Sequence, residues 1–164
     1  CAASAGSLTL SDMDRVRDDD WDSPPGLLSN LRRVISENRL PTLDVDVLRI
    51  DWMDYEEGCE ASDIDTAFDV IIAADCVYLP ETVVPLAQTL RHFLRPDTGV
   101  AYIMSADRDW SDAKYPRASP ADLKKELLAS GWADITESTF TSTSPSGEDQ
   151  PLVLYEVRWR EDAR

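Results

Sequence analysis

The sequence is poor in cysteine, histidine and basic residues, and each shortage excludes a class of site. Its 164 residues include three cysteines and one histidine. The cysteines are odd in number and lack CxxC spacing, so neither a disulfide framework nor a zinc site is indicated. Lys and Arg total 16 against 32 Asp and Glu, a formal net charge of −16. Such a surface repels phosphate backbones, so we expect no nucleic-acid ligand.

Membrane-spanning runs and the common catalytic motifs are also missing. No apolar run approaches the ~20 residues that cross a bilayer, so we expect no membrane partner. The six glycines form neither GxGxxG nor GxxxxGKS, and there is no HExxH motif, nucleophile elbow or Ser-His-Asp arrangement. The single histidine, His92, lies between the apolar positions of a predicted helix and is expected to face solvent. The cysteine usage favours a reducing compartment, and we expect a cytoplasmic monomer, with the nucleus as the alternative location.

One apolar run, from Phe68 to Tyr78, organises the rest of the chain. It is rich in β-branched residues and stops at Asp75, with Tyr78 three residues later. Such runs are typical of parallel strands that are buried on both faces. Ligands of open α/β sheets bind beyond the carboxyl ends of such strands, so Asp75 and Tyr78 fall where a site is expected. The alternative is that Asp75 caps the next helix and Tyr78 is a half-buried loop aromatic.

Strands and helices alternate along the chain and predict one α/β domain over residues 1–164. Ser119 as N-cap, Pro120 in the first turn and Gly131 at the end are typical helix boundaries. The last two strands, 132–140 and 152–159, leave no room for a helix and should form an antiparallel hairpin. We therefore predict a three-layer, mostly parallel sheet with a terminal antiparallel hairpin. The earlier strands are expected at 7–12, 43–50, 68–74 and 99–104, and the helices at 26–39, 80–94 and 119–131.

Acidic residues close three of these strands: Asp12, Asp51 before Trp52, and Asp75 before Tyr78. If the strands are parallel neighbours, their carboxyl ends share one edge of the sheet. An acid at such an end accepts hydrogen bonds from ribose hydroxyls. The acid and the indole of Asp51 and Trp52 could flank a purine. The carboxylate and the phenol of Asp75 and Tyr78 could hold the reacting group.

These strand ends resemble those of the class I, seven-strand S-adenosylmethionine-dependent methyltransferases. More narrowly, they are similar to the protein-lysine methyltransferases with an Asp-x-x-Tyr motif after strand four. Leu8–Asp12, Leu48–Trp52 and, most specifically, Asp69–Tyr78 carry the resemblance, which extends from about Ser7 to Trp159. It implies a Rossmann-like sheet whose terminal hairpin is the antiparallel strand pair of the family.

The resemblance also implies a cofactor, S-adenosyl-L-methionine, and roles for particular residues. Asp12 would bind its ribose hydroxyls, Asp51 and Trp52 would surround its adenine, and Ala74 would line its pocket. Asp75 and Tyr78 would be the catalytic pair that faces the methyl-transfer centre. In the loop after strand five, Trp110 would be an aromatic wall of the site, with packing as the alternative.

The family has a first strand, a glycine motif and a helix before the position of Asp12, where this chain has eleven residues. We therefore expect that the first strand and helix are lacking, either because the chain is part of a longer one or because it is degenerate. The expected activity is methyl transfer to a lysine in a basic protein segment, which suits the acidic charge. The alternatives are a non-catalytic methyltransferase-like scaffold and a small-molecule methyltransferase of the same fold.

Overall fold

The computed structural model of the chain describes residues 7–12, 27–38, 44–55, 67–108, 114–143 and 147–163. It divides into two compact units, Cys1–Asp51 and Trp52–Arg164. None of the helices in these described ranges combines the length and the apolar character that crossing a membrane requires.

The first unit is a pair of parallel strands joined by a helix. Strand β1 (Ser7–Asp12) pairs with β2 (Asp44–Arg49) in register, Ser7 opposite Asp44 and Asp12 opposite Arg49. Parallel strands need a long crossover, and helix α1 (Leu27–Asn38) lies within it. As predicted, Asp12 ends the first strand and Asp51 follows the second. Parallel pairing therefore places both residues at the same edge of this small sheet.

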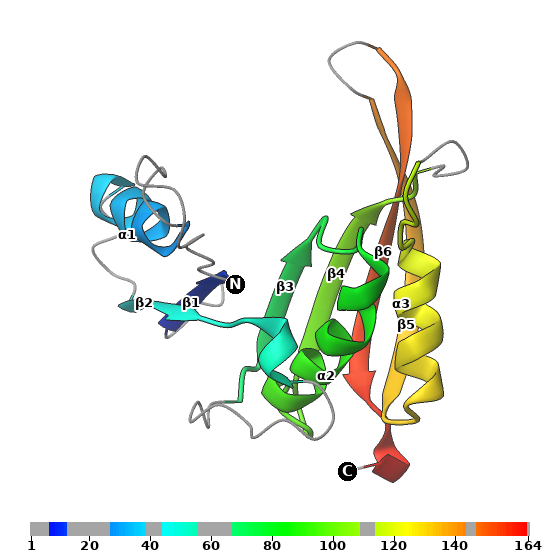
Figure 1. The fold of residues 1–164 in the computed structure, drawn as a ribbon. Helices are drawn as coiled ribbons and strands as arrows, with labels where there is room; N and C mark the ends of the chain where they lie inside the picture. Colours follow the sequence, from blue (N-terminus) through cyan, green and yellow to red (C-terminus); the bar gives the residue numbers. More distant parts are fainter. Residues whose placement is uncertain are drawn as a thin grey trace, which may run out of the picture. The chain divides into compact units, whose positions relative to one another are not determined.

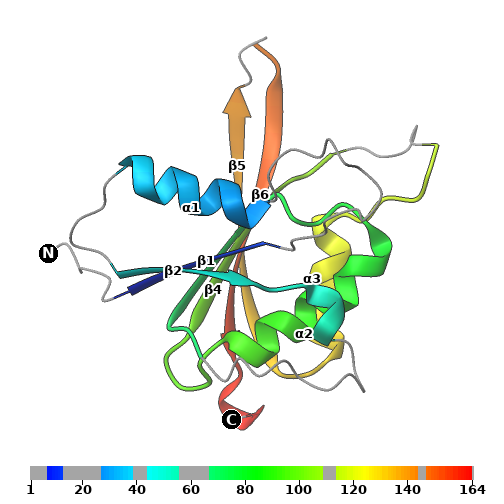
Figure 2. The same cartoon turned by 60° about the vertical axis from the view of Figure 1, so that its left-hand side comes forward.

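The second unit is a mixed sheet with helices on one face (Figures 1 and 2). The strand order in its described part is β3-β4-β6-β5, in which β3 and β4 are parallel and the other two pairings are antiparallel. Short 3-10 helices cover Trp52–Tyr55, Pro80–Thr82 and Glu161–Ala163. The strands and helices are β3 (Val70–Ala74), α2 (Val83–Phe93), β4 (Val100–Ala106), α3 (Pro120–Ala129), β5 (Ala133–Thr143) and β6 (Asp149–Trp159).

The core lies between the sheet and its two helices. On α2, Leu86 and Leu90 are buried at helical spacing, and on α3 Leu123 and Leu127 are fully buried. Each such leucine contributes roughly 1.5–3 kcal/mol by leaving water. The predicted start of α3 is confirmed, because Asp122 accepts hydrogen bonds from the backbone N–H and the hydroxyl of Ser119, both at 2.8 Å. These contacts fix the helices against the strands that carry the site.

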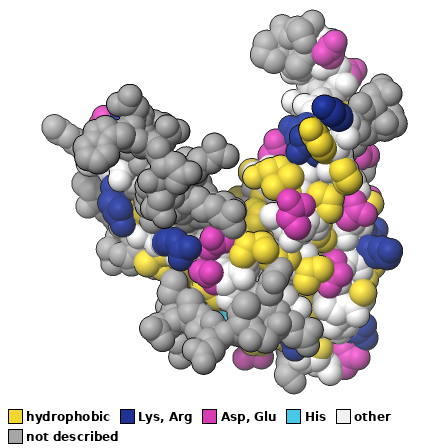
Figure 3. Space-filling view, in the orientation of Figure 1, with side chains coloured by type: hydrophobic (Ala, Val, Ile, Leu, Met, Phe, Trp, Pro, Cys, Tyr) yellow, Lys and Arg dark blue, Asp and Glu magenta, His cyan; other side chains and the backbone are white. Residues whose placement is uncertain are grey.

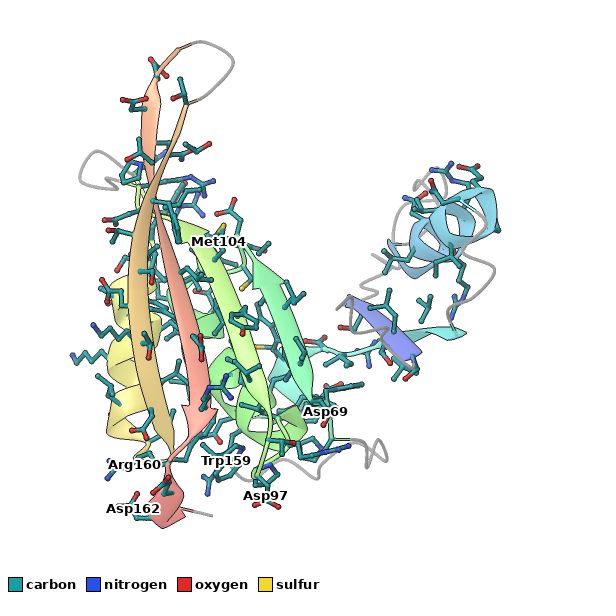
Figure 4. All side chains as sticks on the ribbon, turned by 180° about the vertical axis from the view of Figure 1, so that it is seen from behind. Asp69, Asp97, Met104, Trp159, Arg160 and Asp162 are labelled. Atoms are coloured by element: carbon teal, nitrogen blue, oxygen red, sulfur yellow. The ribbon has the colours of Figure 1, made fainter. Side chains whose placement is uncertain are left out.

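The opposite face of this sheet is exposed (Figure 4). Along β3, Ile71 and Ala73 pack against the core, whereas Val70 is 53% and Ile72 79% exposed. The prediction that this strand is buried on both faces is therefore wrong. The physical reason is that, in the described part of this unit, β3 is at the edge of the sheet and both helices cover the same side. Its unbroken apolar composition did not distinguish one covered face from two.

The terminal hairpin is antiparallel, as predicted, but its strands are longer than expected. Residues 141–143 and 149–150 belong to β5 and β6, not to the connection, with Thr143 opposite Asp149. Threonine favours extended backbone, and the Thr143 hydroxyl donates to the Asp149 carboxylate at 2.9 Å. Strand β4 already ends at Ala106, opposite Leu152. The hairpin therefore projects beyond the sheet edge at which β3 and β4 end (Figures 1 and 2).

Candidate functional site

Asp75 lies immediately beyond the carboxyl end of β3, in an unusual backbone conformation. Its φ is +53°, in the left-handed region that non-glycine residues seldom adopt. The turn is held by its N–H, which donates to the carbonyl oxygen of Met104 at 2.7 Å. Aspartate tolerates this region better than most side chains. A backbone outlier at the edge of a sheet where ligands bind is a reason to examine the side chain for function.

The three residues after Asp75 explain why the aspartate and tyrosine are spaced as they are. Val77 is buried in the core and Cys76 packs against it. Tyr78 is 42% exposed, and its carbonyl oxygen accepts from the N–H of Ala118 at 3.3 Å. Cys76 and Val77 thus pack inward, and they separate the exposed polar side chains of Asp75 and Tyr78 at the end of the strand.

The alternative role of Asp75 as a helix cap does not hold. The 3-10 helix at Pro80 has Leu79 as its N-cap residue, and α2 has Thr82, in neither case with a side-chain capping bond. The carboxylate of Asp75 instead meets a guanidinium. Arg108, just beyond the end of β4, places Nη2 at 2.7 Å from Asp75 Oδ2. Arg108 is not among the residues predicted for the site, although a basic residue two positions after a strand in so acidic a chain is a usable signal.

Cys76, although next to Asp75, is not a nucleophile at neutral pH. Burial raises the pKa of the Cys76 thiol to about 11; a backbone hydrogen bond offsets part of this, and the charge of Asp75 adds to it. The thiolate is the reactive form of cysteine. From Asp75 to Tyr78, the exposed polar side chains are therefore the carboxylate and the phenol.

A groove of about 430 Å³ begins at the residue after Tyr78. Its walls combine apolar surface with Glu81 and the exposed ring of Tyr115. The ammonium of Lys114 lies 5.4 Å from the centre of that ring, so the ring already accepts a cation. Figure 3 shows acidic side chains among hydrophobic ones over this helix-bearing face. The groove is lined by Leu79, Pro80, Glu81, Tyr115, Pro116 and Arg117.

The predicted cofactor residues divide between the units. In the first unit, Asp12 ends β1, and its side chain is outside the described residues. Asp51 is 5% exposed, and its Oδ2 lies 3.4 Å from Nη2 of Arg49. In the second, Trp52 packs against the core, and Ala74 pairs with Met104 at the end of β3. The structure brings Ala74, Asp75 and Tyr78 together at one strand end. Trp110 lies outside the described residues.

Comparison with known proteins bears on what these residues do. Residues 22–118, more than half of the chain and including the Asp75–Tyr78 segment, match the model of the lysine methyltransferase family. The chain belongs to the lysine methyltransferase family. A search of curated proteins gives no match.

Solved structures agree on the fold. The chain is similar to an S-adenosylmethionine-dependent methyltransferase from Methanosarcina mazei, with a TM-score of 0.60 at 13% identity over 95% of this chain and 84% of that one. It is also similar to the N-methyltransferase NodS of Bradyrhizobium japonicum in complex with S-adenosyl-L-homocysteine, with a TM-score of 0.54 at 13% identity over 92% of this chain. The chain spans 66% of that NodS structure. These likenesses confirm the predicted Rossmann-like α/β methyltransferase fold.

S-adenosylmethionine is the cofactor of such a family, and the described residues allow a test of its fit. Its adenosine half offers hydroxyls and an amine that donate hydrogen bonds, together with a flat purine. Asp51 gives a buried carboxylate that accepts, and the partly buried indole of Trp52 follows it directly. A carboxylate that accepts hydrogen bonds and a flat aromatic ring are the chemistry that this half requires, so these two residue types fit the cofactor.

Proposed function

We propose that the protein is an S-adenosylmethionine-dependent methyltransferase that methylates a lysine side chain in a basic segment of another protein. The observation that carries the proposal is the pair of exposed polar side chains, Asp75 and Tyr78, at the end of β3, followed in sequence by a groove that begins at Leu79. The family match covers this segment and supports the lysine acceptor.

Asp75 and Tyr78 act on the acceptor amine in this proposal. When bound, the cofactor supplies a methyl group on a positively charged sulfur, which a neutral amine accepts in line. Such a reaction needs position and the exclusion of water more than acid–base chemistry. The Asp75 carboxylate and the Tyr78 hydroxyl accept hydrogen bonds from the amine N–H groups and orient its lone pair. The protonated thiol of Cys76 does not compete for the methyl group.

The cofactor itself is held by other residues in this proposal. Asp12 accepts from its ribose hydroxyls, Asp51 and Trp52 surround its adenine, and Ala74 lines its pocket. Trp110 is proposed as an aromatic wall near the reacting atoms.

A basic protein segment suits the charge of this chain. The formal net charge of −16 attracts Lys- and Arg-rich segments and raises their rate of encounter. Next to Tyr78, Glu81 and the ring of Tyr115 offer a carboxylate and an aromatic face to a second basic side chain. Cations over a tyrosine ring gain about 0.5–1 kcal/mol at exposed sites.

The test uses S-adenosylmethionine with a labelled methyl group, the purified protein and a cell lysate as the source of acceptors. The variant Asp75→Asn removes the charge and keeps the shape. The matched control is Asp69→Asn at the opposite end of the same strand (Figure 4), where Asp69 pairs with Arg95 at 2.8 Å. We expect a labelled protein band with the unsubstituted protein and with Asp69→Asn, and a strongly weakened band with Asp75→Asn.

Three results would contradict the proposal in different ways. No labelled band with the unsubstituted protein argues for a non-catalytic module. Label that enters only small molecules moves the acceptor to another class. An unchanged band with Asp75→Asn removes Asp75 from the reaction.

A further inference from the structure

We propose that Arg108 is the positioning residue of the reaction, because it fixes the carboxylate of Asp75 for the acceptor amine. This inference rests on the proposed function. It adds a residue that neither the sequence motif nor the family match assigns a role.

The two residues come from neighbouring strands whose ends are held in register. Ala74 pairs with Met104, and the N–H of Asp75 donates to the carbonyl oxygen of Met104 at 2.7 Å. On the other side, the N–H of Asp107 donates to the carbonyl oxygen of Pro151 at 2.9 Å, which ties the chain before Arg108 to the hairpin. Both backbones are therefore anchored directly beside the side chains that meet.

The contact itself leaves part of the carboxylate available. Arg108 Nη2 meets Oδ2 of Asp75 at 2.7 Å. A carboxylate can accept about four hydrogen bonds through its two oxygens. The guanidinium thus fixes the orientation of the carboxylate through Oδ2. Among the described residues no contact is made by Oδ1, which can accept from an amine N–H.

Stability does not account for this ion pair. Both side chains are solvent-accessible, 35% for Arg108 and 51% for Asp75. Exposed pairs contribute about 0–1 kcal/mol to folding, so the loss of Arg108 should leave the fold intact. The rate of methyl transfer depends far more on the orientation of the carboxylate, since a misplacement of about 1 Å can lower a rate about 100-fold. The effect of Arg108 is therefore expected on turnover.

The chain provides a matched control for this pair. Arg95 pairs with Asp69 at 2.8 Å, also between exposed side chains, at the amino end of β3. Arg95→Ala removes a comparable ion pair at the edge that carries no site residues. It reports what the loss of a surface pair does to this protein in general.

The experiment is a double-mutant cycle on methyl transfer to a synthetic peptide that carries the lysine labelled in lysate. We expect Arg108→Ala to lower kcat about 10- to 100-fold with little change in the KM of the peptide. Arg108→Lys should restore part of kcat, because its ammonium still pairs but lacks the planar fork. In an Asp75→Asn background, Arg108→Ala should have no further effect. Arg95→Ala should turn over like the unsubstituted protein.

The outcomes separate this inference from the function on which it rests. If Asp75→Asn lowers turnover and Arg108→Ala does not, Arg108 is not a positioning residue and the proposed function stands. An undiminished loss from Arg108→Ala in the Asp75→Asn background shows that Arg108 acts without Asp75 and overturns the inference. Full turnover of Asp75→Asn overturns both. A loss in Arg108→Ala that Arg108→Lys does not restore, together with a lower melting temperature, assigns a structural role instead.

Discussion

Substitutions at Asp75 should separate the carboxylate from the left-handed turn that carries it. The backbone φ of +53° is tolerated by glycine and asparagine, whereas alanine places its Cβ against the neighbouring carbonyl oxygen. All three substitutions remove the ion pair with Arg108 equally. The difference in stability between Asp75→Ala and Asp75→Asn therefore reports mainly the strain of the backbone conformation.

The left-handed conformation costs an ordinary L-residue about 1–2 kcal/mol, and asparagine less. We therefore expect Asp75→Ala to be about 1 kcal/mol less stable than Asp75→Asn. Asp75→Gly should lie close to Asp75→Asn, since its freedom from steric strain offsets its larger entropy in the unfolded chain. Loss of the exposed ion pair adds about 0–1 kcal/mol to each variant.

Urea unfolding measures this difference. With a slope of about 1–3 kcal/mol per molar, a 1 kcal/mol change moves the midpoint by about 0.3–1 M. Equal midpoints for Asp75→Ala and Asp75→Asn would refute the left-handed turn. The result also decides which variant belongs in activity assays, because only asparagine removes the charge without straining the backbone.

Three further predictions concern the surroundings of the site. Ser105 is buried, and its hydroxyl has no hydrogen-bond partner among the described residues. Ser105→Ala should therefore leave the free energy of unfolding unchanged or raise it by up to about 1 kcal/mol. A clear decrease in the melting temperature would show that the hydroxyl has a partner. Hydrogen bonds from the Ser119 backbone and hydroxyl lower the pKa of Asp122, so the stability it contributes is present above the unfolded-state pKa and lost as the pH falls through the folded one. Asp122→Asn should therefore cost about 1 kcal/mol at neutral pH and nothing at strongly acidic pH, and a difference that persists in acid would contradict this origin. With the other two cysteines replaced by serine, Cys76 should react with iodoacetamide at pH 7.5 far more slowly than a free thiol, and rapid labelling would contradict its burial.

The sequence predicted the elements of the fold well where local signals agree. The Ser119–Pro120 start of α3 and its end near Gly131, with φ of +74°, follow from capping chemistry that needs no tertiary context. The antiparallel hairpin follows from the short connection between its strands. The hairpin is longer than predicted, because Thr141 and Thr143, between the two predicted strands, favour extended backbone when a partner strand lies opposite.

The site was predictable only in part, for physical reasons. Asp75 and Tyr78 stand out because an apolar strand ends at them. The left-handed φ of Asp75 and its contact with Arg108 depend on the pairing of β3 with β4, across 33 positions of sequence. Burial of β3 failed as a prediction because the same apolar run suits a strand covered on one face or on both. Hydrophobic periodicity does not predict contacts between residues that are distant in sequence.

The most direct test of the central claim identifies the atom that receives the methyl group. Protein labelled from S-adenosylmethionine is hydrolysed, and the labelled amino acid is identified by chromatography against methylated standards, with Asp75→Asn and Asp69→Asn in parallel. We predict label in methyl-lysine with the unsubstituted protein and with Asp69→Asn, and far less with Asp75→Asn. Label in any other amino acid, or an undiminished amount of methyl-lysine with Asp75→Asn, would contradict the proposed function.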